Sequence, residues 1–203
     1  MKNLKSFIES GILESYVMGG STPHEMDMVE QMAAKFNEVR TEIESISQAF
    51  EMYALVHAVA PNPAAKPFLM ATIDYTERMK SGEQPTFPPE INERSTINDF
   101  SAWLDRADME LPSHFTGLHA KIIGHMPSSI TAIVWIKDMA PQEIHDHEYE
   151  KFLIVEGACN IIVGEETHPL LPGDYFSIPL HKNHQVIVTS TIPCKVILQR
   201  IAA

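Results

Sequence analysis

The repeat of the apolar residues changes once along this chain of 203 residues, and that change restricts the folds open to it. In the first 80 or so residues, apolar side chains recur at steps of three and four, which predicts amphipathic helices. From about Ser113 the apolar residues alternate instead, as in residues 128–139, and short runs rich in Val and Ile follow. Alternation and even turn spacing predict short strands. The fold class we expect is therefore α+β and multidomain, with an N-terminal helical bundle followed by an all-β barrel or sandwich.

Cap and turn signals divide the chain into three parts. Residues 22–25, Thr-Pro-His-Glu, match a capping box with proline at the first helical position, and Gly82 ends the fourth expected helix. Three prolines within residues 85–89 exclude a helix and predict an extended linker. We expect a helical domain at residues 1–83, a proline-rich linker with one short helix at residues 84–112, and a β domain at residues 113–203.

Two histidines stand two residues apart in the β region. Side chains alternate across a strand, so His145 and His147 would point to the same face. Glu150 follows three residues later, and His184 comes in a later expected strand. Three imidazoles and one carboxylate that meet at one point make a site for a borderline divalent ion.

The order of these residues resembles the two motifs of the cupin superfamily. The first motif is His-x-His, a short gap, Glu, six residues and Gly, and the second is Gly, five residues, Pro-x-Gly, two residues and His. The matching positions here are His145, His147, Glu150 and Gly157, then Gly173, Pro179 and His184. The resemblance covers residues 113–203 and implies a cupin barrel, a double-stranded β-helix or jelly roll. It also implies one divalent transition metal, with Zn expected and Fe, Mn or Ni as alternatives, held by His145, His147, Glu150 and His184.

The sequence departs from these motifs at several positions, so the identity of some metal ligands is not fixed. The gap from His147 to Glu150 is two residues where the family usually has three or four, so Glu148 is a rival ligand. His181 stands where the second motif has glycine, and it could join the metal site or lie at its rim. The pair Cys159 and Cys194 reads as small buried hydrophobic residues, with a redox role as the alternative.

The N-terminal region resembles bacterial anti-sigma factor domains. The segment Glu9-Ser10-Gly11-Ile12-Leu13-Glu14-Ser15-Tyr16-Val17-Met18-Gly19 follows their pattern, as do Val29-Glu30 and Glu38-Val39-Arg40. This resemblance covers residues 5–80 and implies a helical domain that binds a sigma factor. Together with a cupin, it is similar to ChrR-like anti-sigma factors, in which the cupin is a sensor. No cysteine precedes Cys159, so this domain would lack the zinc of the zinc-containing members.

Composition excludes several other classes of partner. The net charge of -12 argues against direct binding of nucleic acid, which needs a basic surface. The two cysteines are too few for a disulfide framework and predict a reducing cytoplasm. No run approaches the roughly 20 apolar residues that span a bilayer, and residues 1–9 do not resemble a signal peptide, so we expect no membrane partner.

Three functions remain open from the sequence. The first is a regulator whose metal-bound cupin senses an unknown small molecule or oxidant while its helices bind a sigma factor. The second is a mononuclear cupin enzyme, a dioxygenase or isomerase, whose helices are an appendage or make a homodimer. The third is a metal-stabilised structural module without chemistry. Arg200 is the one arginine after Ser113, which favours sensing over catalysis on an anionic substrate and leaves the enzyme question open.

Overall fold

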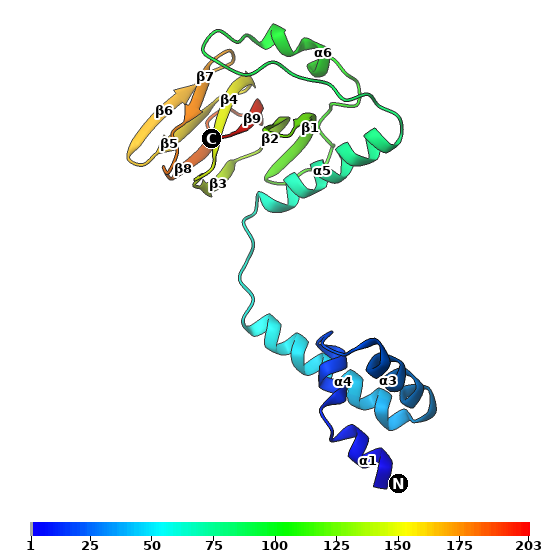
Figure 1. Cartoon of the computed structure of the whole chain (residues 1–203). Helices are drawn as coiled ribbons and strands as arrows, with labels where there is room; N and C mark the ends of the chain where they lie inside the picture. The colour runs from blue at the N-terminus through cyan, green and yellow to red at the C-terminus, as the bar shows by residue number, and fades with distance from the viewer. Residues whose placement is uncertain (1) are drawn as a thin grey trace. The chain divides into compact units, whose positions relative to one another are not determined.

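The chain divides into two compact units after Ala60 (Figure 1). The structure, a computed structural model, describes the backbone of residues 2–203. Unit 1 ends at Ala60, and unit 2 runs from Pro61 to Ala203. The boundary expected at 83/84 therefore lies at 60/61. The reason is that the last of the four expected helices packs on the β-sheet and belongs to unit 2.

Unit 1 holds four helices around a small apolar core. They are α1 (Lys2–Ile8), α2 (Ile12–Val17), α3 (Pro23–Lys35) and α4 (Asn37–Val56). The capping box at the start of α3 forms as expected, because the Thr22 side chain accepts from the Glu25 backbone while Glu25 accepts from the Thr22 backbone. Leu13, Val29 and Val39 are fully buried and hold these helices together.

The second half of α4 does not join that core. Ile43 and Ile46 pack against it, but every residue from Ser47 to Ala60 is exposed. Phe50 and Tyr53 continue the three- and four-residue spacing of the apolar residues on this helix, yet they are 40% and 66% exposed. The helix therefore presents large apolar side chains that nothing in unit 1 covers.

Unit 2 contains two antiparallel β-sheets (Figure 1). The strands are β1 (Leu118–Met126), β2 (Ser129–Ile136), β3 (Met139–Glu143), β4 (Glu148–Glu156), β5 (Cys159–Val163), β6 (Glu166–Leu170), β7 (Tyr175–Ile178), β8 (His184–Val188) and β9 (Cys194–Ala202). One sheet has the order β1-β2-β9-β4-β7 and the other β3-β8-β5-β6. Side chains from both sheets, such as Val134, Phe152, Ile161 and Val186, meet in one buried core. This is the β-sandwich that the alternating residues predict.

Helix α5 (Ala65–Lys80) lies against the edge strand β1 of the larger sheet. Ala71 is buried in the same core as Ala120 and Ile122 of β1. Arg78 of α5 also donates from Nη2 to the carbonyl oxygen of Ile122. The helix thereby covers an edge whose backbone groups would otherwise face water.

Residues 84–112, which we call the strap, cross the other face of the larger sheet. The expectation of an irregular proline-rich stretch is correct, and it is followed by η1 (Ile97–Phe100) and α6 (Ser101–Leu104). The strap is not a free linker, because Ile91, Phe100 and Met109 are buried against the sheet. The Gln199 side chain accepts from the Ile91 amide at 2.9 Å and donates to the Pro89 carbonyl at 3.2 Å.

The strap passes so close to β1 that one strand position has no room for a side chain. A Cβ at Gly124 would lie 2.3 Å from Cδ of Pro88 and 3.1 Å from the carbonyl oxygen of Thr86. Glycine is therefore required here by the close approach of two backbones. In the part of the chain that the structure describes, no helix has the length and apolar character needed to cross a membrane.

Candidate metal centre

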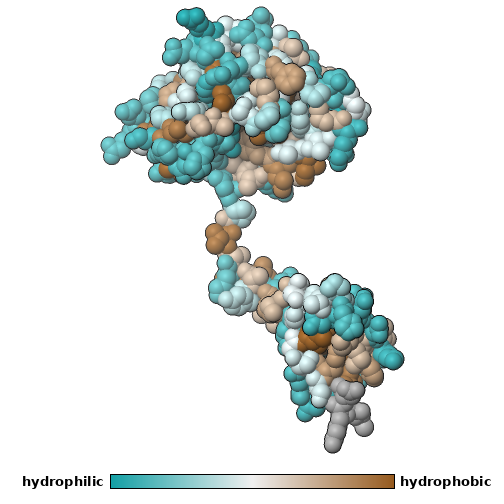
Figure 2. Space-filling model, in the orientation of Figure 1, coloured by the Kyte–Doolittle hydropathy of each residue, from teal (hydrophilic) through white to brown (hydrophobic). Residues whose placement is uncertain are grey.

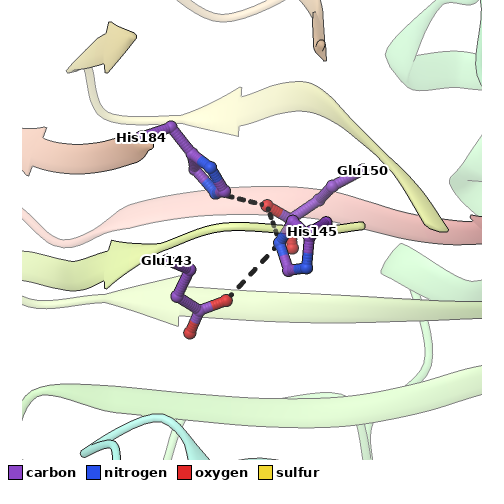
Figure 3. Close-up of side chains that lie close together, drawn as sticks. All are labelled: Glu143, His145, Glu150 and His184. Carbon is purple, nitrogen blue, oxygen red and sulfur yellow. Dashed lines mark hydrogen bonds and ion pairs between the residues drawn. The ribbon is translucent and has the colours of Figure 1, made fainter. Parts of the chain in front are cut away.

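Two glutamates and two histidines converge inside the β-sandwich (Figure 3). Glu143 ends β3, His145 lies in the turn after it, Glu150 lies on β4 and His184 begins β8. One donor atom from each of the four lies within 4.8 Å of the others. Glu150 and His184 are only 3% and 4% exposed. We call these four residues the Glu-His cluster.

The spacing of the donor atoms fits a single divalent ion. Nε2 of His184 lies 3.0 Å from Oε2 of Glu150, and Nε2 of His145 lies 3.4 Å from the same oxygen. Nε2 of His145 is also 3.6 Å from Oε2 of Glu143. Ligands about 2.0–2.2 Å from a tetrahedral ion stand about 3.3–3.6 Å apart, so the cluster could hold a metal with small adjustments.

One atom of the cluster needs a partner that the described residues do not supply. Nε2 of His145 is buried and makes no hydrogen bond of acceptable geometry. Leaving a buried polar nitrogen without a partner costs about 1–3 kcal/mol. A proton shared with a carboxylate, or a metal ion, would satisfy it. Nδ1 of the same ring lies 3.3 Å from Oε1 of Glu148, a contact that orients the imidazole.

The electrostatics of the cluster favour charged carboxylates. Burial alone would raise the pKa of Glu150, but the adjacent imidazole of His145, the hydrogen bond with His184 and the charge of Arg200 outweigh it and hold the pKa well below its usual range. The nearby carboxylate of Glu150 raises the pKa of His145 against the opposing effect of burial. An ionised carboxylate beside imidazole nitrogens is the state that binds a cation.

Arg200 of β9 already occupies part of the cluster. Its Nε donates to Oε1 of Glu150 at 2.8 Å, and its Nη2 donates to Oε2 of Glu143 at 2.9 Å. Glu150 and Arg200 face each other in the β4–β9 register. With both imidazoles neutral, two carboxylates and one guanidinium leave one negative charge, which a bound cation or one proton would offset.

The start of α5 and the residues just before it lie next to the cluster. Asn62 donates from Nδ2 to Oε1 of Glu143 at 3.4 Å, and the guanidinium carbon of Arg200 lies 4.9 Å from the ring centroid of Phe68. Ala64 and Phe68 line a space that also borders Glu150 and that measures only about 30 Å³. Such a space holds a water molecule but no organic ligand. We call residues 62–68 the roof.

Three of the four expected ligands lie in the cluster, and His147 does not. Residues 144–147 form a turn between β3 and β4, so the alternation expected of a strand does not apply, and His147 is exposed. Glu143 is the residue that the sequence reasoning missed. Its spacing of two from His145 repeats the pattern of a ligand pair, and the gap from His145 to Glu150 is four residues. The short gap between His147 and Glu150 was the sequence feature that could have pointed to Glu143 and His145 as the pair of ligands.

The other candidates lie outside the cluster. His181 is exposed, its Nδ1 is 3.0 Å from Oδ1 of Asp146, and its φ of 59° explains why the motif prefers glycine there. Cys159 and Cys194 are free and buried. A hydrogen bond between the two thiols lowers the pKa of Cys159 and raises that of Cys194. Both are apolar core residues in this state.

Comparison with known proteins supports a cupin domain in the β region. Residues 132–199 match the family model described as a cupin domain. A search of curated proteins finds no match. Among solved structures, the chain is similar to the Schizosaccharomyces pombe Cnp3 cupin domain, with 17% identity, a TM-score of 0.42, and 46% of this chain and 72% of that chain covered.

Two further solved structures are similar to the same degree. KdgF from Halomonas sp. has 22% identity and a TM-score of 0.40, with 44% of this chain and 84% of that chain covered. A predicted oxalate decarboxylase from Thermotoga maritima has 13% identity and a TM-score of 0.41, with 42% and 81% covered. At such values these similarities say nothing about the substrate, metal or partner of this chain.

Proposed function

We propose that this chain is an anti-sigma factor in which a metal-binding cupin domain regulates how the helical unit binds a sigma factor. The observation that carries the proposal is the position of the roof. Unit 1 ends at Ala60, and Asn62, two residues later, contacts Glu143 of the Glu-His cluster. A change at the cluster therefore acts directly on the segment that joins the two units.

Arg200 supplies the physical link between the cluster and the roof. A bound metal would supply two positive charges to the cluster and so favour its ionised carboxylates. Arg200 donates to both of these carboxylates and stacks on Phe68 of the roof. Binding of a cation by Glu143 and Glu150 would compete with Arg200 and so alter its contact with Phe68 of the roof.

Two imidazoles and two carboxylates form a mixed set of nitrogen and oxygen donors. Such a set suits Zn, Fe, Mn or Ni, and each further carboxylate favours the harder ions of that group. Zn remains the first candidate because it accepts a four-ligand site closed by the protein. The predicted ligand His147 would have to turn inward from its exposed position to take part.

The helical unit offers a surface for a protein partner. Besides the motif positions that resemble anti-sigma domains, α4 exposes Phe50, Tyr53, Leu55 and Val56. Figure 2 shows hydrophobic atoms along the segment that leads out of the N-terminal unit. Large apolar side chains that remain together at the surface mark protein interaction sites. Association of two copies of this chain through the same helix is the alternative.

The alternative function is a mononuclear cupin enzyme. Such an enzyme must admit its substrate beside the metal, but the space next to Glu150 and His184 measures about 30 Å³. A separate open pocket of about 440 Å³ borders Glu143, His145 and Arg200. An organic substrate could therefore reach these residues from outside but would find no room beside Glu150 and His184. The small inner space favours regulation over catalysis at the buried ligands.

The test is a sigma-factor binding assay on the intact protein. A tagged chain is recovered from its source cells, the sigma factor in the eluate is identified, and its affinity is measured with metal and with a chelator. We expect the two affinities to differ in the wild type and the difference to shrink in Phe68→Ala. Leu69→Ala is the matched control, because Leu69 is its neighbour on α5 and is 60% exposed. Absence of any sigma factor contradicts the proposal.

A further inference from the structure

A second cavity, of about 660 Å³, lies in unit 2 between α5 and β1. Cavities of roughly 300–1,000 Å³ are the size that holds small organic ligands. It borders Lys66, Met70 and Asp74 of α5 and Leu118, His119 and Lys121 of β1. It does not border any member of the Glu-His cluster. We call it the α5–β1 cavity.

The charges around this cavity are unbalanced toward the positive. The Lys121 side chain is only 19% exposed, and its Nζ lies 3.6 Å from Oδ1 of Asp74. The other oxygen of Asp74 accepts from Nε of Arg78 at 3.1 Å, and Arg78 also pairs with Glu83. Asp74 is the one carboxylate among the residues that line the cavity. Lys66 adds a second ammonium group to the wall. A half-buried lysine with a shared counter-ion gains stability from a further anion.

His119 adds an unused hydrogen-bonding atom. Its Nε2 is buried, and the described residues offer it no hydrogen-bond partner. Burial, together with the charge of Lys121, lowers the pKa of His119, so the ring is neutral near pH 7 and able to donate or accept. Its ring packs at a tilt against Trp135, with centroids 5.6 Å apart, and this contact orients it.

The rest of the wall is apolar. Met70, Leu118 and Met139 line the cavity together with several prolines. An apolar wall with a few convergent polar groups is the usual composition of a small-molecule site. We propose that the α5–β1 cavity binds an organic anion with an apolar body, whose charged end pairs with Lys66 and Lys121.

Calorimetric titration of the intact protein with decanoate tests the site, with decanol as the probe of equal length but no charge. We expect saturable binding of one decanoate per chain and weaker binding of decanol. Lys121→Met keeps the aliphatic stem and removes the charge, and it should weaken decanoate binding about tenfold. Lys80→Met is the matched control, because Lys80 lies on the same helix, pairs with Glu77 and does not border the cavity. It should leave the affinity unchanged.

A second variant tests the position without changing a charge. Thr116 lines the cavity and is exposed, so Thr116→Trp should fill the space and abolish binding while the protein stays folded. Three results would overturn the proposal. They are no saturable decanoate binding, equal affinity for decanol and decanoate, and decanoate binding that neither Lys121→Met nor Thr116→Trp changes. Binding that both variants leave intact would place the probe on another surface, such as the exposed half of α4.

Discussion

Arg200 donates to Oε1 of Glu150 at 2.8 Å, so the most buried carboxylate of the Glu-His cluster already holds a cation from its own chain. A metal bound by the cluster would compete with the guanidinium for the same oxygen atoms. Because Arg200 also contacts Phe68, metal binding there would be coupled to the movement of a side chain that touches the roof.

Metal content should distinguish the Glu-His cluster, which contains Glu143, from the ligand set of the sequence motif, which contains His147 instead. We expect about one divalent ion per chain in the wild type and a loss of at least about tenfold in affinity in Glu143→Gln. His147→Ala should keep its metal, because His147 is exposed outside the cluster. Elemental analysis after dialysis against a weak chelator measures both. Full occupancy in Glu143→Gln with loss in His147→Ala would favour the ligand set that the sequence motif predicts.

Removing the guanidinium of Arg200 should lower the stability of the metal-free protein and raise its affinity for metal. Arg200→Met removes the positive charge that pairs with Glu143 and the buried Glu150, so we expect the metal-free protein to lose about 3 kcal/mol of unfolding free energy. Metal affinity should rise, because the competing cation is gone. Urea unfolding with metal and with chelator measures both effects. Arg94→Met, at an exposed position on the strap, is the control and should change neither.

Gly124→Ala should detach the strap from β1. The new methyl group would lie 2.3 Å from Cδ of Pro88, and we expect a loss of about 1–3 kcal/mol in unfolding free energy. Gly20→Ala is the control, because the nearest atom to its Cβ, Oγ of Ser15, would lie at 3.4 Å. Pro88→Ala combined with Gly124→Ala should cost less than the sum of the two single changes. Additive losses would argue against the contact.

Acid should weaken the attachment of the strap near Glu83. Oε1 of Glu83 accepts from Nη1 of Arg106 at 2.7 Å and from Nη1 of Arg78 at 2.8 Å. The hydrogen bond from Arg106 is the main reason that the pKa of Glu83 lies below its ordinary value of 4.5. A lowered pKa in the folded state gives stability that is present above pH 4.5 and lost as pH falls through the folded pKa.

Replacing Glu83 by glutamine tests this dependence of stability on pH. Glu83→Gln should be less stable than the wild type at pH 7, and the difference should shrink steadily below pH 4.5. Urea unfolding at several pH values measures it. Glu93→Gln, at an exposed position, serves as the control. A difference that stays constant with pH would show that the ion pairs contribute no pH-dependent stability.

Limited proteolysis should cut between the two units and spare the strap. Residues 57–63 are exposed and lie outside helices and strands, whereas the strap buries Ile91 and Phe100. We expect a stable fragment that begins near Pro61, identified by mass spectrometry. Early cleavage at residues 84–89 would instead support the free linker that the prolines suggest.

Local patterns predicted the elements well but not their neighbours. The apolar spacing predicts a helix that ends at Gly82. No local feature of the sequence shows that Phe68 and Ala71 of this helix pack with β1 and not with the other helices. Alternation failed at His147, because it assumes a strand and the chain turns there. Arg200 joins the cluster through the β4–β9 register, a pairing of residues 50 positions apart that spacing does not reveal.

The packing of α5 against β1 also determines which fragments of the protein should fold without aggregating. A fragment that starts at residue 84 would lose this helix and expose the edge of β1 together with Ala120 and Ile122, which are 4% and 3% exposed in the intact chain. An uncovered apolar edge strand pairs with other chains, so such a fragment should aggregate. A fragment that starts at Pro61 keeps its edge protected and should stay monodisperse.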